Sequence, residues 1–503
     1  MRILVTLSWL VLVLGANVLR AQEEQQVGEY LGSSGCFDCH EEPSGAAKAR
    51  GTIKFIELTE AEDWVKKDKH ARAFSNILET KLGRDMLDVL NIKQDGLAQA
   101  SQCTSCHSNP HWVAKKGANE DPNTKYKESG VTCESCHGGS SLWDTRHRSV
   151  EWRLRSPVAP DGIRRDFRHP DATKKDFGMT NVRDPEQRAS LCFSCHIGDV
   201  SKNRIVTHEM YAAGHPPLPS IELETFLEKM PRHWRTMEEK QGTQFLHDAA
   251  FYDVNRVTQT EYRRLESVVM SAAVAFQTSV RMIKQQAENS MEPGGPAWPE
   301  LALFDCYSCH HDLKLPSWRQ VRANEVLGYR LRPGRPQLLY WPTTLLPLSG
   351  SLDRVNARLV NVGKELDRRP FGDAGQIALA AGGVVDEVGV LVQSLRGVSL
   401  QEGDVDRLLL QLCQQAESPT VDYESARQIG WAFVVVLGQY RPAIQEKSAG
   451  LLERLAIQLR LDLPWGQDEK IDEQLPAALE AVSDFEPEAF RAVMSELRRA
   501  LGQ

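Results

Sequence analysis

The chain has 503 residues, of which 41% are hydrophobic and 25% are charged, and this composition is typical of a folded protein rather than a disordered one. Its 60 basic and 68 acidic residues give a formal net charge of -8, which excludes nucleic-acid binding through a strongly basic surface. A chain of this length exceeds what one hydrophobic core usually organises, so we expect two structural parts.

The N-terminus has the pattern of a secretory signal. Arg2 is followed by an apolar stretch from Ile3 to Leu14, and small residues follow at Ala16 and Ala21. The short apolar region favours a signal peptide over residues 1–21, and an uncleaved membrane anchor is the alternative. Later apolar runs such as 431–437 are too short to span a bilayer, so we expect no second membrane segment.

The cysteines carry the strongest signal in the chain. Ten of the 11 form CxxC pairs, and a histidine follows each pair directly. Two thiols at this spacing can form thioethers to the vinyl groups of one haem, and the adjoining histidine can then bind the iron from one face. The sequence therefore predicts five covalently attached haems c. The expected attachment residues are Cys36, Cys39, Cys103, Cys106, Cys133, Cys136, Cys192, Cys195, Cys306 and Cys309, and the expected axial ligands are His40, His107, His137, His196 and His310.

CxxC pairs have two other common uses in proteins, and both fit this chain less well. Zinc sites also take thiolate pairs, but zinc has no need for a histidine directly after every second cysteine. Disulfides within CxxC pairs would form small redox-active loops rather than structural crosslinks. The eleventh cysteine, Cys413, lies among leucines at helical spacing and is interpreted as a core thiol.

The predicted fold is mainly α, and strand alternation is scarce. A cytochrome domain rich in loops and helices is expected over 22–330, with a long helix from about Glu261 to Asn289. A proline-rich linker is expected over 331–350. A haem-free helical domain is expected over 351–503, either as a bundle that covers the haem core or as a docking module. Its expected helices lie at about 352–367, 374–396, 403–417, 423–440, 444–460 and 486–501.

Nine histidines remain outside the motifs and are the candidates for the second axial position. A second ligand must approach the iron from the opposite side of the porphyrin. His311 directly follows His310, and His111 lies one helical turn from His107, so each would serve a neighbouring haem if it binds iron at all.

Three segments around the motifs resemble the cytochrome c-554 family, which is related to hydroxylamine oxidoreductase and similar multihaem cytochromes. They are WVKKDKHARAF at 64–74, GVTCESCHGGS at 130–140 and HEMYAAGHPPL at 208–218, and the resemblance covers about residues 30–320. In that family, distant histidines complete haems that have two histidine ligands, and the haems stack in close pairs.

The resemblance implies that His70, His147, His208 and His215 are distal ligands. Such a role is left open for His169, His233 and His311, whereas His111 and His247 are interpreted as surface residues or propionate partners. The chain departs from the family's four-haem pattern by its fifth motif and its C-terminal extension. It also lacks the CxxCK variant of the catalytic haem in pentahaem nitrite reductase, which disfavours that enzyme.

An arginine-rich stretch follows the third motif between Arg146 and Lys175. Arginine binds carboxylates through two parallel hydrogen bonds, so neutralising haem propionates is the favoured interpretation, and an anionic substrate or partner site is the alternative.

Together these features predict an exported pentahaem cytochrome that transfers electrons between redox protein partners. We expect it to be periplasmic or otherwise outside the cytoplasmic membrane of a bacterium. The N-terminus adds membrane association if it is not cleaved. The alternative function is an oxidoreductase for a small nitrogen or sulfur compound, which needs an iron with an open sixth position. A third hypothesis, compatible with electron transfer, is a scaffold whose C-terminal helices recruit an enzyme.

Overall fold

The fold is known from a computed structural model, which describes residues 28–40, 60–109, 130–147, 177–234, 263–310, 322, 326–398, 400–462 and 471–502. The expected signal peptide lies outside these residues. So do His111, His169, His247 and His311, together with the arginines between 148 and 168.

The described structure is helical and its only β pairing is two isolated bridges, which confirms the mainly α fold. The region that carries the motifs contains short helices: α2 (Ser34–His40), α3 (Glu60–Lys67), α4 (Ser75–Glu79), α5 (Lys81–Val89), α6 (Ser101–His107), α9 (Cys133–His137), α10 (Asp144–His147), α12 (Pro185–His196), α13 (His208–Ala212) and α14 (Leu223–Lys229). Single 3-10 turns connect them: η2 (Lys69–Arg72), η3 (Gln94–Gln99), η4 (Ser140–Leu142) and η6 (Val200–Lys202).

Longer helices follow. They are α18 (Arg263–Asn289), α21 (Asp353–Arg368), α22 (Ala374–Leu395), α23 (Glu402–Ala416), α24 (Tyr423–Tyr440), α26 (Ala449–Leu459), α27 (Ile471–Ser483) and α28 (Pro487–Ala500). The shorter elements between them are η8 (Leu301–Leu303), η9 (Cys306–Ser308), α20 (Trp341–Thr344), η10 (Leu346–Ser349) and α25 (Pro442–Lys447).

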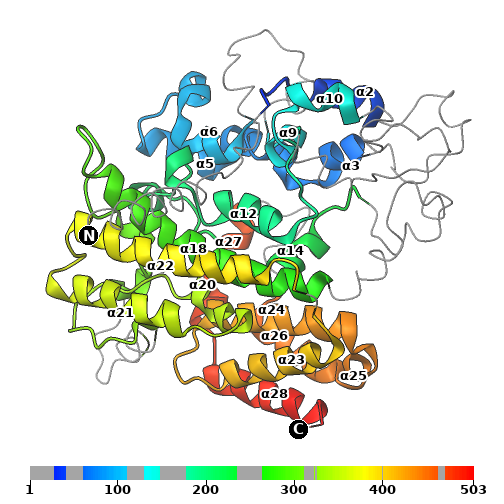
Figure 1. The fold of residues 1–503 in the computed structure, drawn as a ribbon. Helices are drawn as coiled ribbons and strands as arrows, with labels where there is room; N and C mark the ends of the chain where they lie inside the picture. The colour runs from blue at the N-terminus through cyan, green and yellow to red at the C-terminus, as the bar shows by residue number, and fades with distance from the viewer. Residues whose placement is uncertain are drawn as a thin grey trace, which may run out of the picture.

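Helix α18 lies at the centre of the molecule, between the motif-bearing helices and the C-terminal helices (Figure 1). Every residue from Ser267 to Phe276 is buried, so this helix is packed on more than one side. Val274, Phe276 and Val280 pack in a core with α12, α21 and α22. Leu265 and Val268 pack in a second core with α23, α24, α26 and α28.

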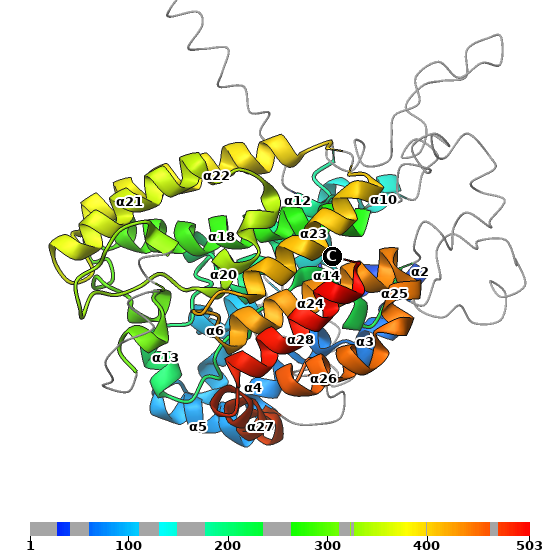
Figure 2. The same cartoon turned by 90° about the horizontal axis from the view of Figure 1, so that it is seen from below.

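The C-terminal helices pack closely against one another. In the view from below, α23, α24 and α28 lie side by side, in agreement with their contacts (Figure 2). Asp422 caps α24 by accepting a hydrogen bond from the backbone amide of Ser425. Cys413 is 1% exposed within this core, which confirms it as a core thiol, and burial raises its pKa to about 12.

The predicted helices match the observed ones closely, and α18 agrees with the helix expected to end at Asn289. The segment 444–460 is two helices, α25 and α26, because the chain turns at Ser448. Helix α27 was not predicted, and Pro476 inside it explains why. The core around α18 contains residues from both sides of the 331–350 linker, and the division into two domains stays a prediction.

By length and composition alone, helix α22 is long and apolar enough to span a membrane. Of the residues in its most apolar stretch, 39% are buried inside the structure. With 22 residues it is longer than the run 431–437, which is too short to span a bilayer. It packs on α18 and α21 through Ile377, Val384 and Val388, each of which is fully buried. A core helix of a folded domain has the same properties.

Replacing Phe276 by alanine should lower the free energy of unfolding by roughly 3–5 kcal/mol, because truncating a buried aromatic ring leaves a cavity that the helices cannot fill. Phe276 is 1% exposed on α18. Chemical denaturation gives the measurement, with Leu379→Ala on α22 as the control because Leu379 is 72% exposed. Equal losses in the two variants would contradict the central position of α18.

Candidate functional site

Four of the five CxxCH motifs end a helix with their histidine. The first ends α2, the second ends α6, the third forms α9 and the fourth ends α12. In a helix, residues three positions apart lie on the same side, so the two thiols of a motif face one way and the histidine follows on the next position. The fifth motif begins in the 3-10 turn η9, where Asp305 caps the turn.

Every motif cysteine whose side chain is described is a free thiol. The described part of the chain also holds no group of three or more histidine, cysteine and carboxylate side chains that could bind a metal ion alone. The zinc interpretation therefore finds no tetrahedral donor set among these residues.

Four motif histidines each face a histidine from another segment of the chain. The separations of the ring centroids fall in a narrow range, although the segments differ widely in sequence. The pairs are His40 with His147 at 6.5 Å, His70 with His196 at 6.1 Å, His107 with His215 at 6.4 Å and His208 with His310 at 6.3 Å.

This separation fits two imidazoles on opposite faces of one haem. A metal–imidazole bond is about 2.0 Å long and the ring centroid lies about 1.1 Å behind the bonding nitrogen, so two axial rings are about 6.2 Å apart. Rings in direct stacking contact would be closer. The residues present therefore fit haem with two histidine ligands.

The angles between the ring planes fall into two classes. The rings of His40 and His147 are nearly parallel at 15°, and those of the pair His208 and His310 are at 23°. The pair His70 and His196 is nearly perpendicular at 89°, and the pair of His107 with His215 is at 74°.

Hydrogen bonds orient several of these rings through Nδ1. The Nδ1 of His40 lies 3.0 Å from Oε2 of Glu60, and that of His70 lies 2.9 Å from Oδ1 of Asp68. Carbonyl oxygens of Ala73, Trp143 and Pro216 accept from the Nδ1 atoms of His107, His147 and His215 at 3.0, 3.2 and 2.7 Å. A ring that donates through Nδ1 presents Nε2 to a metal, so these contacts set the tautomer that ligation needs.

Burial favours the neutral imidazole at several of these positions. It lowers the pKa of His196 to about 4 and also lowers the pKa values of His107 and His215. The hydrogen bond that His40 donates to Glu60 has the opposite effect and raises the pKa of His40. At His70 burial acts to lower the pKa, but the hydrogen bond to Asp68 and the charge of that carboxylate raise it. Neutral imidazole is the form that binds iron, so burial supports ligation at neutral pH.

The carboxylates Glu60 and Asp68 were missed in the sequence. Asp68 is 4% exposed and precedes His70 by two residues in the segment WVKKDKH, so its position was a usable signal. Glu60 begins α3 and is separated from His40 by residues outside the described structure, so no local pattern links them.

Contacts among the motifs place them in a spatial order. The thiol of Cys133 raises the pKa of Cys36 through a hydrogen bond, so the first and third motifs are adjacent. Cys195 has the same effect on Cys106, which joins the second and fourth motifs. Burial and then the charge of Cys192 raise the pKa of Cys136, which places the third motif beside the fourth.

Helix α13 connects the fifth motif with the second, because histidines near its two ends pair with different motifs. His208 begins this helix and pairs with the fifth motif, whereas His215 lies just beyond its end and pairs with the second. The Tyr211 ring lies between them in sequence, with its centroid 6.0 Å from that of His215. His208 and His310 are both exposed side chains.

The other described residues that the sequence singled out lie outside the four histidine pairs. His137 of the third motif is not a member of the four pairs. His233, for which a ligand role was left open, lies near Asp68 and lowers the pKa of its carboxyl, although burial and His70 have larger effects. Arg146, at the start of the arginine-rich stretch, stacks over the Phe177 ring at 4.7 Å.

A family model described as cytochrome c554 and c-prime matches residues 35–138. The match covers the first three CxxCH motifs and the segment containing His70, which is a smaller part of the chain than the resemblance seen in the sequence. No curated protein and no solved structure matches the chain.

Proposed function

We propose that this chain, which is similar to the cytochrome c554 and c-prime family over residues 35–138, is an exported pentahaem cytochrome that passes electrons between redox protein partners. The family match supports covalent haem c and a redox role. The observation that carries the proposal is the set of four histidine pairs at 6.1–6.5 Å. When bound, haem c supplies an iron that cycles between the ferric and ferrous states by one electron.

On the basis of these pairs we propose ligands for four of the five sites. His147 completes the first motif, His215 the second, His70 the fourth and His208 the fifth. Each ligand comes from a segment distant from its motif, so ligation would hold the short helices of this region together. The prosthetic groups would then replace much of the side-chain core that these helices lack.

The order in which the motifs neighbour one another supports electron transfer from haem to haem along a single path. The contacts described above give the order first, third, fourth, second and fifth. The exposed pair His208 and His310 lies at one end of this line, and the half-buried pair His40 and His147 lies at the other. We propose that redox partners exchange electrons at these two ends.

The alternative function, catalysis on a small substrate, is less well supported. An oxidoreductase acting on a small nitrogen or sulfur compound needs an iron with an open axial position. The four pairs would occupy both axial positions at their sites, which disfavours such a reaction there.

The third site is proposed to take its second ligand from His233. Its Nδ1 is buried without a hydrogen-bond partner, and the residue lies near Asp68, whose charge in turn acts on Cys136 of the third motif. Replacing His233 by alanine should convert one low-spin iron to high-spin and allow carbon monoxide to bind to the reduced protein. Optical spectra with and without carbon monoxide give the measurement. A spectrum identical to that of the wild type would remove His233 from the ligand set.

We also propose that the N-terminal signal directs export to the periplasm, as is usual for c-type cytochromes. The mass of the mature protein distinguishes cleavage near Ala21 from an uncleaved anchor.

Electron paramagnetic resonance of the oxidised protein tests the ligand assignment. The angle between two axial imidazole planes sets the splitting of the iron d orbitals, so parallel and perpendicular planes give different low-spin signals. The angles of 15° and 23° should give rhombic signals, and those of 74° and 89° should give strongly anisotropic ones. A spectrum dominated by high-spin iron would overturn the electron-transfer proposal.

A further inference from the structure

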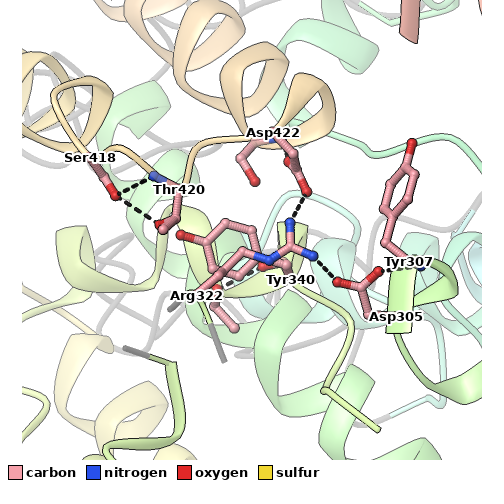
Figure 3. A network of polar contacts seen from close by, with 9 residues as sticks. Asp305, Tyr307, Arg322, Tyr340, Ser418, Thr420 and Asp422 are labelled. Carbon is pink, nitrogen blue, oxygen red and sulfur yellow. Dashed lines mark hydrogen bonds and ion pairs between the residues drawn. The ribbon is translucent and has the colours of Figure 1, made fainter. Parts of the chain in front are cut away.

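The fifth motif is joined to the haem-free C-terminal helices by one buried arginine. Arg322 is 1% exposed and donates from Nη2 to Asp305, the residue directly before Cys306. Its Nη1 donates to Asp422 at the start of α24 at 2.5 Å. The guanidinium lies between the two carboxylates and stacks over the Tyr340 ring at 4.6 Å (Figure 3).

Asp305 transmits this contact to the motif itself. Its Oδ1 accepts a hydrogen bond from the backbone amide of Tyr307 at 2.8 Å, and its carbonyl accepts from the amide of Ser308 at 2.9 Å. Its own amide donates to the carbonyl of Gln337 at 2.9 Å. The carboxylate that binds Arg322 therefore also shapes the turn that carries the two motif cysteines.

The charged side chains of this contact are largely buried, so losing one of them should disturb the others. Asp305 is 6% exposed, and the side chain of Asp422 is 15% exposed. Removing one member of a buried ion pair leaves the other charge without compensation in a medium of low polarity. Arg322 can satisfy both carboxylates because the planar guanidinium has donors on two sides, which a lysine lacks.

We propose that Arg322 is a positioning residue for the fifth haem site, through which the C-terminal helices fix the ligation and the reduction potential of that site. The inference rests on the proposed function, since it assumes that the fifth motif carries haem. It gives the C-terminal region a role in tuning the exposed end of the electron path.

The sign of the expected effect follows from charge. Replacing Arg322 by methionine increases the negative charge, which stabilises ferric iron and lowers the potential of the fifth site. Replacing Asp422 by asparagine removes a negative charge and should raise it. Asparagine also keeps the cap of α24, so this variant should fold normally.

The experiment is a redox titration of the full-length haem-loaded protein with optical detection, for the wild type, R322M and D422N. Arg441→Met is the matched control. Arg441 is a partly buried arginine that pairs with Asp406 at 3.0 Å. It directly follows α24, whose 18 residues separate it from Asp422 by about 27 Å.

We expect one of the five redox components to shift downward in R322M and upward in D422N, and none to shift in R441M. We also expect faster hydrogen exchange in the peptide 304–310 of R322M alone. Wild-type potentials in both R322M and D422N would overturn the inference. A wild-type protein with fewer than five redox components would instead overturn the proposed function, so the two failures are distinguishable.

Discussion

Replacing His70 by alanine is expected to convert one haem from six-coordinate low-spin to high-spin iron. The ring of His70 faces His196 of the fourth motif at 6.1 Å, and alanine leaves that axial position without a protein ligand. The ring planes are at 89°, so the variant should also lose one of the strongly anisotropic signals in the paramagnetic resonance spectrum. Optical and resonance spectra of the oxidised protein measure both effects.

The matched variant is His147→Ala. Its ring faces His40 at 15°, so this substitution should remove a rhombic signal and leave the anisotropic ones. The double variant should show two high-spin irons. Loss of the same signal in both single variants, or an unchanged spectrum in either, would contradict the pairing.

Replacing both Cys192 and Cys195 by serine is expected to remove one haem, because serine cannot form the thioether bonds. Stability should also fall, since Phe193 between them is 1% exposed in the main core and α12 packs directly on α18. The mass of the intact protein gives the haem number, and thermal unfolding gives the loss of stability.

Cys413→Ser is the control for this double substitution. Cys413 is 1% exposed but lies outside the motifs, so its substitution should reduce stability while leaving the haem number unchanged. Full haem content in the double serine variant would contradict the assignment of the fourth motif.

The helical fold could be predicted because periodicity dominates its longer elements. The apolar residues of α18, such as Val268, Phe276 and Ile283, recur at helical spacing, and the predicted helix agrees with the observed one. The role of α18 as a shared centre could not be predicted, because periodicity reveals an apolar face but not its partner. Helix α27 was missed because Pro476 normally ends a helix.

The site was predictable where chemistry imposes a fixed spacing. A CxxCH motif needs its cysteines and histidine within five residues, so the motifs were found directly. The histidines that face the motif histidines, such as His147 and His215, come from distant segments, and only the family resemblance selected them. The pairing itself, for example His147 with the first motif rather than the third motif that precedes it, depends on tertiary folding. The orienting carboxylate of Glu60 left no local pattern for the same reason.

The number of haems per polypeptide tests the central claim most directly. The mass of the intact mature protein, compared with the mass of its polypeptide, gives this number without assumptions about ligation. We predict five covalently bound haems, one for each CxxCH motif. A mature protein that carries four or fewer would contradict the pentahaem assignment.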